Sequence, residues 1–222
     1  MQRELPRLAD YVTLEELDQD FTRRNLKLSD RQYDEKFHIL QGPSLLGPDI
    51  GYYREVCGAR RNMIAVAYLD IDNFKVLNAN HGEAVVDSNV LPVFMRELER
   101  FVFSRGHAYR FGGDEYAILL TNAQGADRCL QDLQRSLAEV PYRDIKERTP
   151  VSIGLCTVDG DSYLSDQAVV ERANKAMRHA KKAGRNCIAT YGGELFRDED
   201  LVVYPRRSCD HHSSSTDVGN GG

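Results

Sequence analysis

The stretch 110–120 constrains the fold of this chain more than any other. It holds the run Gly112-Gly113-Asp114-Glu115 between two segments rich in β-prone residues. Glycine pairs favour tight hairpin turns because they tolerate positive φ angles. We therefore predict a β-hairpin over residues 107–120 with two carboxylates at its turn. Carboxylates in this position are natural ligands for a hard divalent cation such as Mg2+, which takes carboxylate and phosphate oxygens together.

An earlier segment supplies a second set of acids. The apolar run 64–69 ends in Asp70-Ile71-Asp72, and Lys75 follows three residues later. Side chains alternate along a strand, so Asp70 and Asp72 are expected to share one face. Acids and a lysine at the carboxyl end of a strand, facing an acidic hairpin, are components of a metal–phosphate site. We predict that the two segments form a single site.

Composition excludes several classes of protein. The chain has 222 residues, of which 41% are hydrophobic, and a formal charge of −5, so nothing attracts it globally to nucleic acid or to acidic membranes. No apolar run approaches the roughly 18 residues of a membrane span, and no secretory signal is apparent. The five cysteines are scattered, which favours reduced thiols and a cytoplasmic location over a disulfide framework.

The chain divides into three predicted regions. Residues 1–48 are expected to be a helical N-terminal extension, because the spacing of apolar residues over 14–21 and 33–40 is typical of helix faces. Glycine–proline pairs at 42–43 and 47–48 then predict a break. This extension is expected to pack on the core, to dimerise or to bind a regulatory protein. Residues 49–204 form the predicted catalytic domain, and 205–222 a disordered tail.

Helical and strand patterns alternate through the predicted catalytic domain. This alternation, with one hairpin, indicates an α/β sandwich resembling a nucleotidyl cyclase or polymerase palm, with a central mixed, mainly antiparallel sheet flanked by helices. Besides the hairpin, the pattern predicts strands over 64–70, 151–158 and 187–191, and helices near 84–104, 124–139 and 165–183.

The motifs together resemble the GGDEF family, the diguanylate cyclases. The family's markers are an Asp-x-Asp-x-Phe-Lys strand end, an Asn eight residues after the first Asp, and a Gly-Gly-[Asp/Glu]-Glu-[Phe/Tyr] hairpin. Matching residues here are Asp70 to Lys75, Asn78, and Gly112 to Tyr116. Segments 150–154 and 180–186 also match in order and spacing, so the resemblance covers about residues 62–192.

The resemblance implies a metal site and a reaction. Asp70 and Glu115 are implied to bind Mg2+ or Mn2+, with the Ile71 carbonyl as a third oxygen. Asp114 is implied to act beside the metal or to assist deprotonation of a 3′-hydroxyl, and Lys75 completes the catalytic set. The alternatives from the residues themselves are that Asp70 caps the next turn and that Asp114 faces solvent.

Triphosphate binding is implied for Lys75, Lys181 and Arg185. The amides of Asn73 and Phe74, at the start of a predicted helical turn, are also expected to point at phosphate. Lys181 and Arg185 are four residues apart, so they share a helix face if the helix extends that far. The alternative is that cations near a helix end only interact with its dipole.

Guanine recognition is implied for Asn78 and Asp87. A carboxylate can accept hydrogen bonds from guanine N1–H and N2–H2 together, and adenine has no such donor pair. A helix cap for Asp87 and a turn role for Asn78 are the alternatives. The chain departs from the family pattern at Ala79, Glu83 and Val86, and the β-branched Val86 beside Asp87 is expected to narrow or tilt the base pocket.

The resulting expectation is a diguanylate cyclase that condenses two GTP into cyclic di-GMP and two pyrophosphates, within a two-fold homodimer. Two alternatives remain open. The first is a related synthase that makes another cyclic dinucleotide, for example in phage defence, and the altered stretch 79–86 motivates it. The second is a non-catalytic GGDEF module that binds GTP or a protein.

Overall fold

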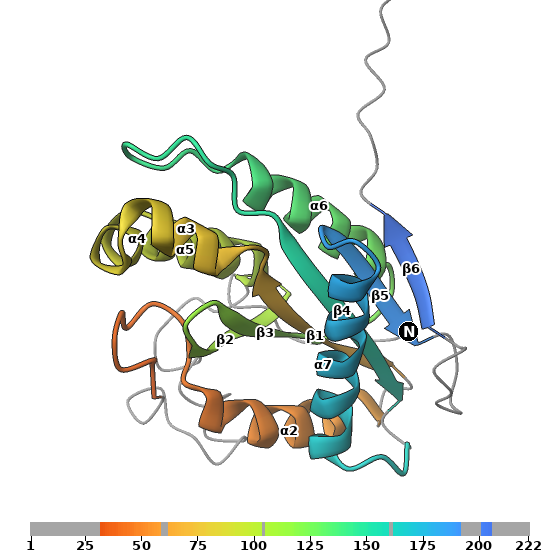
Figure 1. Ribbon diagram of the computed structural model, residues 1–222. Coiled ribbons are helices and arrows are strands. Elements are labelled where there is room, and N and C mark those ends of the chain that lie inside the picture. Colours follow the sequence, from red (N-terminus) through yellow and green to blue (C-terminus); the bar gives the residue numbers. More distant parts are fainter. Residues whose placement is uncertain (1–31, 59–61, 104, 160–161, 192–200, 206–222) are drawn as a thin grey trace, which may run out of the picture.

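A computed structural model describes residues 32–58, 62–103, 105–159, 162–191 and 201–205. Within these ranges a six-stranded mixed sheet has the strand order β2-β3-β1-β4-β5-β6 (Figure 1). All neighbouring pairs are antiparallel except β4 and β5, which are parallel and joined by the crossover helix α7. The strands are β1 (Met63–Ile71), β2 (Gly106–Gly112), β3 (Glu115–Leu120), β4 (Val151–Asp159), β5 (Cys187–Tyr191) and β6 (Leu201–Pro205).

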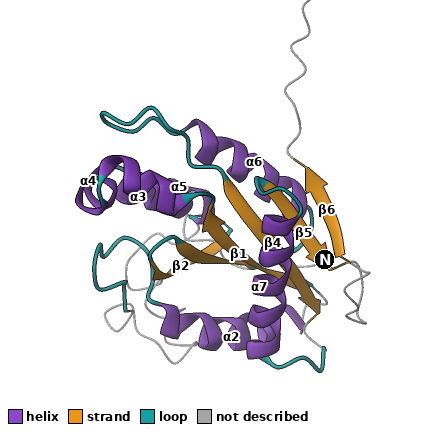
Figure 2. Cartoon of the chain, in the orientation of Figure 1, coloured by secondary structure: helices purple, strands orange, loops and turns teal. Residues whose placement is uncertain are grey.

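Helices cover both faces of the sheet (Figure 2). One face packs on α2 and α7 through a cluster that includes Val66, Tyr68 and Met177. The opposite face packs on α3 to α6 through a larger cluster that includes Leu69 and Phe94. The central strand β1 is buried on both faces, which explains its continuous apolar run. The helical elements are η3 (Pro43–Leu45), α2 (Leu46–Gly58), α3 (Phe74–His81), α4 (Glu83–Asn89), α5 (Leu91–Val102), α6 (Ala126–Glu139) and α7 (Asp166–Lys182).

The predicted fold class is confirmed: the protein is an α/β sandwich with a mixed, mainly antiparallel sheet. Each predicted strand is present, and β6 is an additional one. The single helix predicted near 84–104 is instead two helices, α4 and α5, which meet at Val90. Pro92 lies in the first turn of α5, where its missing N–H leaves no helical hydrogen bond unmade.

The helix predicted over residues 33–40 is wrong. These residues form a turn instead, bridged between Tyr33 and Gln41. Asp34 holds the turn, because its Oδ1 accepts hydrogen bonds from the amides of Lys36 and Phe37 at 3.2 and 3.1 Å. The break predicted at 42–48 is also wrong, since Pro43 begins η3 and Pro48 lies in the first turn of α2.

The last residues of the predicted extension pack on the core. Leu40, Leu45 and Leu46 are all buried, and α2 runs through residue 48. The helix predicted over 14–21 lies outside the described residues, as does the tail predicted over 205–222 except for Pro205, which ends β6.

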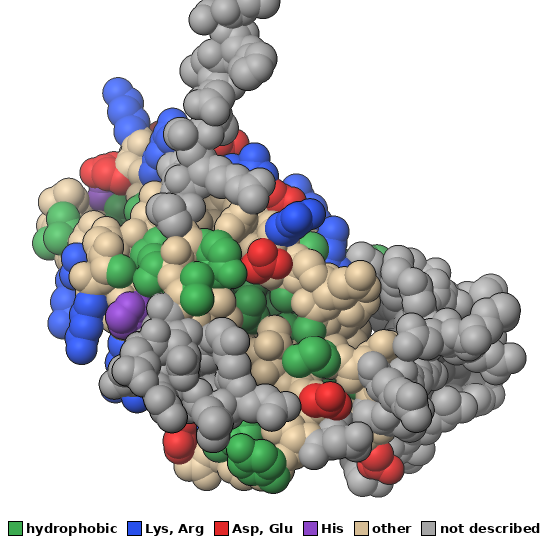
Figure 3. Space-filling view, turned by 90° about the vertical axis from the view of Figure 1, so that its right-hand side faces the viewer, with side chains coloured by type: hydrophobic (Ala, Val, Ile, Leu, Met, Phe, Trp, Pro, Cys, Tyr) green, Lys and Arg blue, Asp and Glu red, His purple; other side chains and the backbone are tan. Residues whose placement is uncertain are grey.

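Figure 3 shows the face on the β6 side, where hydrophobic side chains gather near the middle and charged ones lie mostly toward the margins. Val202 on β6 is 44% exposed.

No helix in the described part of the chain is long and apolar enough to cross a bilayer. The four cysteines in the described ranges, Cys57, Cys129, Cys156 and Cys187, are free.

Gly154 allows α7 to pack directly on β4. A Cβ at this position would lie 2.0 Å from the Ala173 carbonyl oxygen and 2.1 Å from the Met177 amide nitrogen. These are backbone atoms of α7, so no side-chain rotation relieves the contact. The close approach matters for function because α7 carries Lys181, described below.

We expect Gly154→Ala to destabilise the protein by roughly 1–3 kcal/mol or more, because α7 must shift to admit the methyl group. Denaturant unfolding measures the change. Gly47→Ala in α2 is the matched control: its Cβ would meet nothing within 4 Å, so this helical substitution should be neutral or slightly stabilising. Equal stability of the two variants would contradict direct helix–strand contact at Gly154.

Candidate active site

The pairing of β1 with β3 brings the two predicted halves of the site together. Asp70 near the end of β1 lies directly opposite Glu115 at the start of β3. The Ile71 amide donates a hydrogen bond to the Asp114 carbonyl at 3.3 Å, which fixes the hairpin turn against the strand end. Gly113 adopts φ 49° in that turn, a left-handed conformation that favours glycine. Three carboxylates therefore gather at one end of the sheet.

Asp70 is a buried carboxylate with one unused oxygen. Its Oδ2 forms an ion pair of 2.5 Å with Lys181 Nζ from α7, and its side chain is only 7% exposed. Its Oδ1 is buried and has no hydrogen-bond partner within the described ranges. Burial, together with the neighbouring Asp114 and Glu115 carboxylates, raises the pKa of Asp70 to about 6, although Lys181 acts in the opposite direction. A second cation at Oδ1 would relieve this cost.

Asp72 is an anchor rather than a ligand. Ser152 on β4 donates to its Oδ1 at 2.7 Å, and the Asn186 amide donates to its Oδ2 at 2.8 Å. The Asp72 amide in turn donates to the Pro150 carbonyl at 2.8 Å. Both oxygens of this buried side chain are thus engaged by protein donors. Asp72 ties the end of β1 to β4 and to the loop that follows α7.

Tyr68 was not singled out from the sequence. Its side chain is 3% exposed and packs against Phe111 with ring centroids 5.2 Å apart. The Tyr68 hydroxyl hydrogen-bonds to the Glu115 carboxylate. Burial and this carboxylate raise the pKa of Tyr68 to about 12. The hydroxyl therefore stays protonated and orients Glu115. Its position two residues before Asp70, on the same face of β1, was the signal available in the sequence.

The donor set fits a magnesium ion that also binds substrate phosphate. Carboxylates of Asp70 and Glu115 and the carbonyl of Ile71 are hard oxygen ligands, which Mg2+ prefers. Within the described residues, no three His, Cys, Asp or Glu side chains converge into a complete metal cage. One or two carboxylates completed by phosphates and water are the usual arrangement for Mg2+ in nucleotide-handling sites.

Most predicted phosphate binders surround the same end of the sheet. Lys181 is in contact with Asp70. Burial raises the pKa of Asp72, and the charges of Lys181 and Arg185 act in the opposite direction. Arg185 has φ 66° in the loop after α7, so it does not continue the helix face predicted for it with Lys181. Asn73, also left-handed at φ 58°, precedes α3, which Phe74 begins. Lys75 is exposed on α3.

The predicted base readers lie on the opposite face of the sheet, on α3 and α4. The Oδ1 of Asn78 is buried without a hydrogen-bond partner in the described part of the chain. Asp87 on α4 forms an ion pair of 2.5 Å with Lys36. Lys36 was missed by sequence analysis, because 51 residues separate it from Asp87.

The expectation that Val86 narrows the base pocket is wrong. Its side chain is fully buried in the core cluster that joins α4 to the sheet and α5. Neighbouring helical residues point in different directions, so Val86 faces inward while Asp87 is partly exposed. Ala79 and Glu83, the other two departures, are exposed to solvent.

Comparison with known proteins identifies the family. The sequence profile described as "Diguanylate cyclase, GGDEF domain" matches residues 53–187, more than half of the chain. The chain therefore belongs to the GGDEF family, as the motifs predicted.

Its relatives include characterised members of this family. The chain is 32% identical over 127 residues to diguanylate cyclase DgcP of Pseudomonas aeruginosa, a match that covers 55% of this chain and 18% of the relative. It is 30% identical over 135 residues to diguanylate cyclase A of Treponema denticola, covering 59% of this chain and 36% of the relative. The match thus spans only about a fifth to a third of these relatives.

Solved structures agree on the fold. The active GGEEF domain of a diguanylate cyclase from Vibrio cholerae superposes with a TM-score of 0.61 at 24% identity, covering 68% of this chain and 97% of that one. Diguanylate cyclase SiaD of Pseudomonas aeruginosa, in complex with its activator SiaC, gives a TM-score of 0.64 at 24% identity, covering 79% of this chain and 68% of that one.

The buried Asp70 predicts an unusual dependence of stability on pH. A carboxyl group whose pKa is raised on folding binds its proton more tightly in the folded state than in the unfolded chain. The free energy of unfolding without divalent cation should therefore fall as pH rises from about 3.8 through about 6. In Asp70→Asn this loss is absent, so relative to wild type the variant gains on the order of 2 kcal/mol between pH 4 and pH 7.

Denaturant unfolding of both proteins at pH 4 and pH 7 measures this difference. Adding Mg2+ at pH 7 should raise the melting temperature of the wild type and leave that of Asp70→Asn unchanged, because binding to the folded state stabilises it. If the stability of wild type relative to Asp70→Asn does not fall between pH 4 and pH 7, the pKa of Asp70 is not raised on folding.

A substitution of Val86 tests whether its side chain is buried in the core between α4, α5 and the sheet. Val86→Ala should destabilise the protein by roughly 1–3 kcal/mol, since it leaves a cavity in the core. Val85→Ala is the control, because its side chain is 40% exposed. Thermal unfolding compares the two variants. If Val86→Ala is as stable as Val85→Ala, Val86 does not have the core position described here.

Proposed function

We propose that this chain is a Mg2+-dependent diguanylate cyclase, which condenses two GTP into cyclic di-GMP and two pyrophosphates. The observation that carries this proposal is the buried Asp70 opposite Glu115, with one carboxylate oxygen unpaired in the described structure and the other on Lys181. A purely structural module gains nothing from a buried carboxylate with an unused oxygen, because that arrangement costs stability. This weighs against the non-catalytic alternative.

Asp70, Glu115 and the Ile71 carbonyl hold the metal in this proposal. A bound Mg2+ lowers the pKa of the 3′-hydroxyl and neutralises charge on the α-phosphate and pyrophosphate. Asp114 would accept the proton of the attacking hydroxyl; its backbone carbonyl accepts from the Ile71 amide, and its charge acts on Asp70. Lys75, Lys181 and Arg185 bind the triphosphate, together with the amides of Asn73 and Phe74.

In this proposal Lys181 pairs with Asp70 before substrate binds and with the substrate phosphates afterwards. Without substrate it neutralises Asp70 at 2.5 Å. The ammonium group is 31% exposed, so it would be able to turn from Asp70 toward the substrate phosphates. Asp70 would then be available to hold the metal, and Lys181 would keep an anionic partner.

Asn78 and Asp87 read guanine, and each protomer holds one GTP. Two protomers must meet around a two-fold axis so that each 3′-hydroxyl faces the α-phosphate of the other nucleotide. The extension 1–48 is proposed to assist this pairing or to bind a regulatory protein. The SiaD–SiaC complex is an example of a related structure with a protein activator.

The direct test incubates the full chain with each of the four nucleoside triphosphates and Mg2+, and identifies products by mass spectrometry. We expect cyclic di-GMP from GTP alone, with specific activity that rises with enzyme concentration in the dilute range, because a lone protomer cannot complete the reaction. An adenine-containing cyclic dinucleotide would point to the alternative synthase. Bound GTP without product, at any enzyme concentration, would point to a binding module.

The sharpest variant is Glu115→Gln. The amide keeps the shape of the side chain and loses the charge that holds the metal, so turnover should fall by roughly 10²- to 10³-fold. Glu99→Gln on the exposed side of α5 is the control and should retain full activity. Unchanged circular dichroism confirms that both variants fold. Undiminished product formation by Glu115→Gln would remove this residue from the metal site.

A further inference from the structure

The carboxylate proposed to read guanine already has a cationic neighbour. Lys36 Nζ lies 2.5 Å from Asp87 Oδ2, with the lysine side chain 50% exposed and the aspartate side chain 22% exposed. The other carboxylate oxygen, Oδ1, accepts no hydrogen bond from any residue in the described ranges. A donor and an acceptor are thus presented together at the exposed side of α4.

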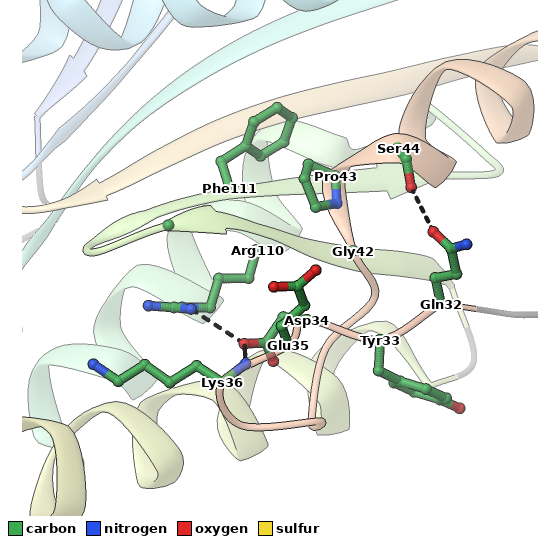
Figure 4. Close-up of a pocket in the computed structure, with 11 residues that line it drawn as sticks. Gln32, Tyr33, Asp34, Glu35, Lys36, Gly42, Pro43, Ser44, Arg110 and Phe111 are labelled. Carbon is green, nitrogen blue, oxygen red and sulfur yellow. Dashed lines mark hydrogen bonds and ion pairs between the residues drawn. The ribbon is translucent and has the colours of Figure 1, made fainter.

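The backbone of Lys36 is fixed relative to the hairpin that carries the metal ligands (Figure 4). Asp34 Oδ1 accepts from the Lys36 amide at 3.2 Å and from Arg110 of β2 at 3.1 Å. Arg110 also donates to the Gly113 carbonyl in the hairpin turn at 3.3 Å. Asp34 and Arg110 are both buried, so this linkage is part of the fold and not a mobile surface contact.

Lys36 has room to adjust around a ligand. Its side chain is 50% exposed, and the cavity of about 450 Å3 that it lines, between the segment 32–44 and the end of β2, does not include Asp87. In Figure 4 its side chain extends past the Arg110 guanidinium group, away from Gly42 and Ser44. An exposed ion pair of this type contributes little to stability, typically below about 1 kcal/mol. Ligand binding can therefore rearrange it at small cost.

Guanine presents three groups along one edge. N2–H2 and N1–H donate, and O6 accepts. A carboxylate satisfies the two donors and leaves O6 without a partner. An ammonium group next to the carboxylate can supply the missing donor, because lysine has three N–H groups and needs only one for Asp87. Adenine would instead place its 6-amino donor against the ammonium group, which is repulsive.

We propose that Lys36 is a specificity-determining residue, whose ammonium group donates to guanine O6 while Asp87 accepts from N1–H and N2–H2. This inference rests on the proposed function, because it takes Asp87 as the base reader. It assigns base selection to a lysine and an aspartate that are 51 residues apart in the sequence. The segment 32–41 is then part of the substrate site.

The test measures binding of two nucleotides by calorimetry in the full chain. GTP has O6, whereas 6-thioguanosine triphosphate keeps N1–H and the 2-amino group and carries at position 6 a sulfur, which is a much weaker acceptor. Lys36→Met should weaken GTP binding roughly tenfold, the value of a charged hydrogen bond in a partly exposed site, and change binding of the analogue less than twofold. Lys36→Arg keeps a donor and should retain most of the GTP affinity.

Lys146→Met, an exposed lysine in the loop before β4, is the control and should bind both nucleotides like wild type. Tighter GTP binding by Lys36→Met would overturn the proposal and show that Lys36 competes with the base for Asp87. Equal weakening of both nucleotides would also overturn it, because it would place Lys36 at the phosphates or ribose. Thermal unfolding of each variant verifies that the exposed substitution leaves the fold intact.

Asp87→Ala separates this inference from the proposed function. If Asp87→Ala weakens GTP binding and Lys36→Met does not, guanine reading stands and the role of Lys36 is rejected. If wild-type protein fails to bind GTP in preference to ATP, both the base assignment and the Lys36 proposal are rejected together. Product analysis with Mg2+ then determines whether another base is used.

Discussion

The register between β1 and β3 is the constraint on which the rest of the site depends. It places Asp70 opposite Glu115, and the adjoining Ile71–Asp114 hydrogen bond fixes the hairpin turn against the strand end. A slip of one residue would turn every side chain of β1 to the other face, moving Asp70 away from Lys181. Such a slip would also carry the Asp70 carboxylate onto the face of the apolar cluster around Leu69, where burial of a charge is costly. The core thus specifies the geometry of the carboxylates.

The charges at this end of the sheet are balanced by two different means. The Asp72 carboxylate accepts hydrogen bonds from Ser152 and from the Asn186 amide. It therefore connects the end of β1 to β4 and to the loop after α7. Asp70 is neutralised by one movable lysine and keeps an unused oxygen. Two acids that alternate with one apolar residue in the sequence therefore have different roles, and the difference comes from the elements that pack beside them. Burial raises the pKa of both carboxyl groups. Protein donors bind both oxygens of Asp72, whereas one oxygen of Asp70 is left for a ligand.

Local sequence patterns were sufficient to predict those elements whose structure depends on neighbouring residues in the sequence. The hairpin, the strand ends and the mixed sheet follow from glycine turn preferences, alternation and apolar runs, and they are confirmed. The side-chain direction of Val86 could not be read from its neighbour Asp87, because helical geometry separates adjacent residues by about 100°. The turn at 34–40 was predicted as a helix because its apolar spacing fits one. Asp34 overrides that spacing by binding two backbone amides and the distant Arg110, a contact between residues 76 apart that no local pattern reveals.

These long-range contacts have a consequence for the substrate. Asp70 and Glu115 lie on the α7 side of the sheet, whereas Asn78 and Asp87 lie on helices of the opposite side. A nucleotide that touches both sets must pass around the carboxyl end of β1, with phosphates on one side and base on the other. The buried Arg110–Asp34 pair and the backbone hydrogen bonds of Gln41 with Ala108 and Arg110 join the hairpin to the turn that carries Lys36. In the proposed function, these contacts would fix the position of the turn relative to the carboxylates.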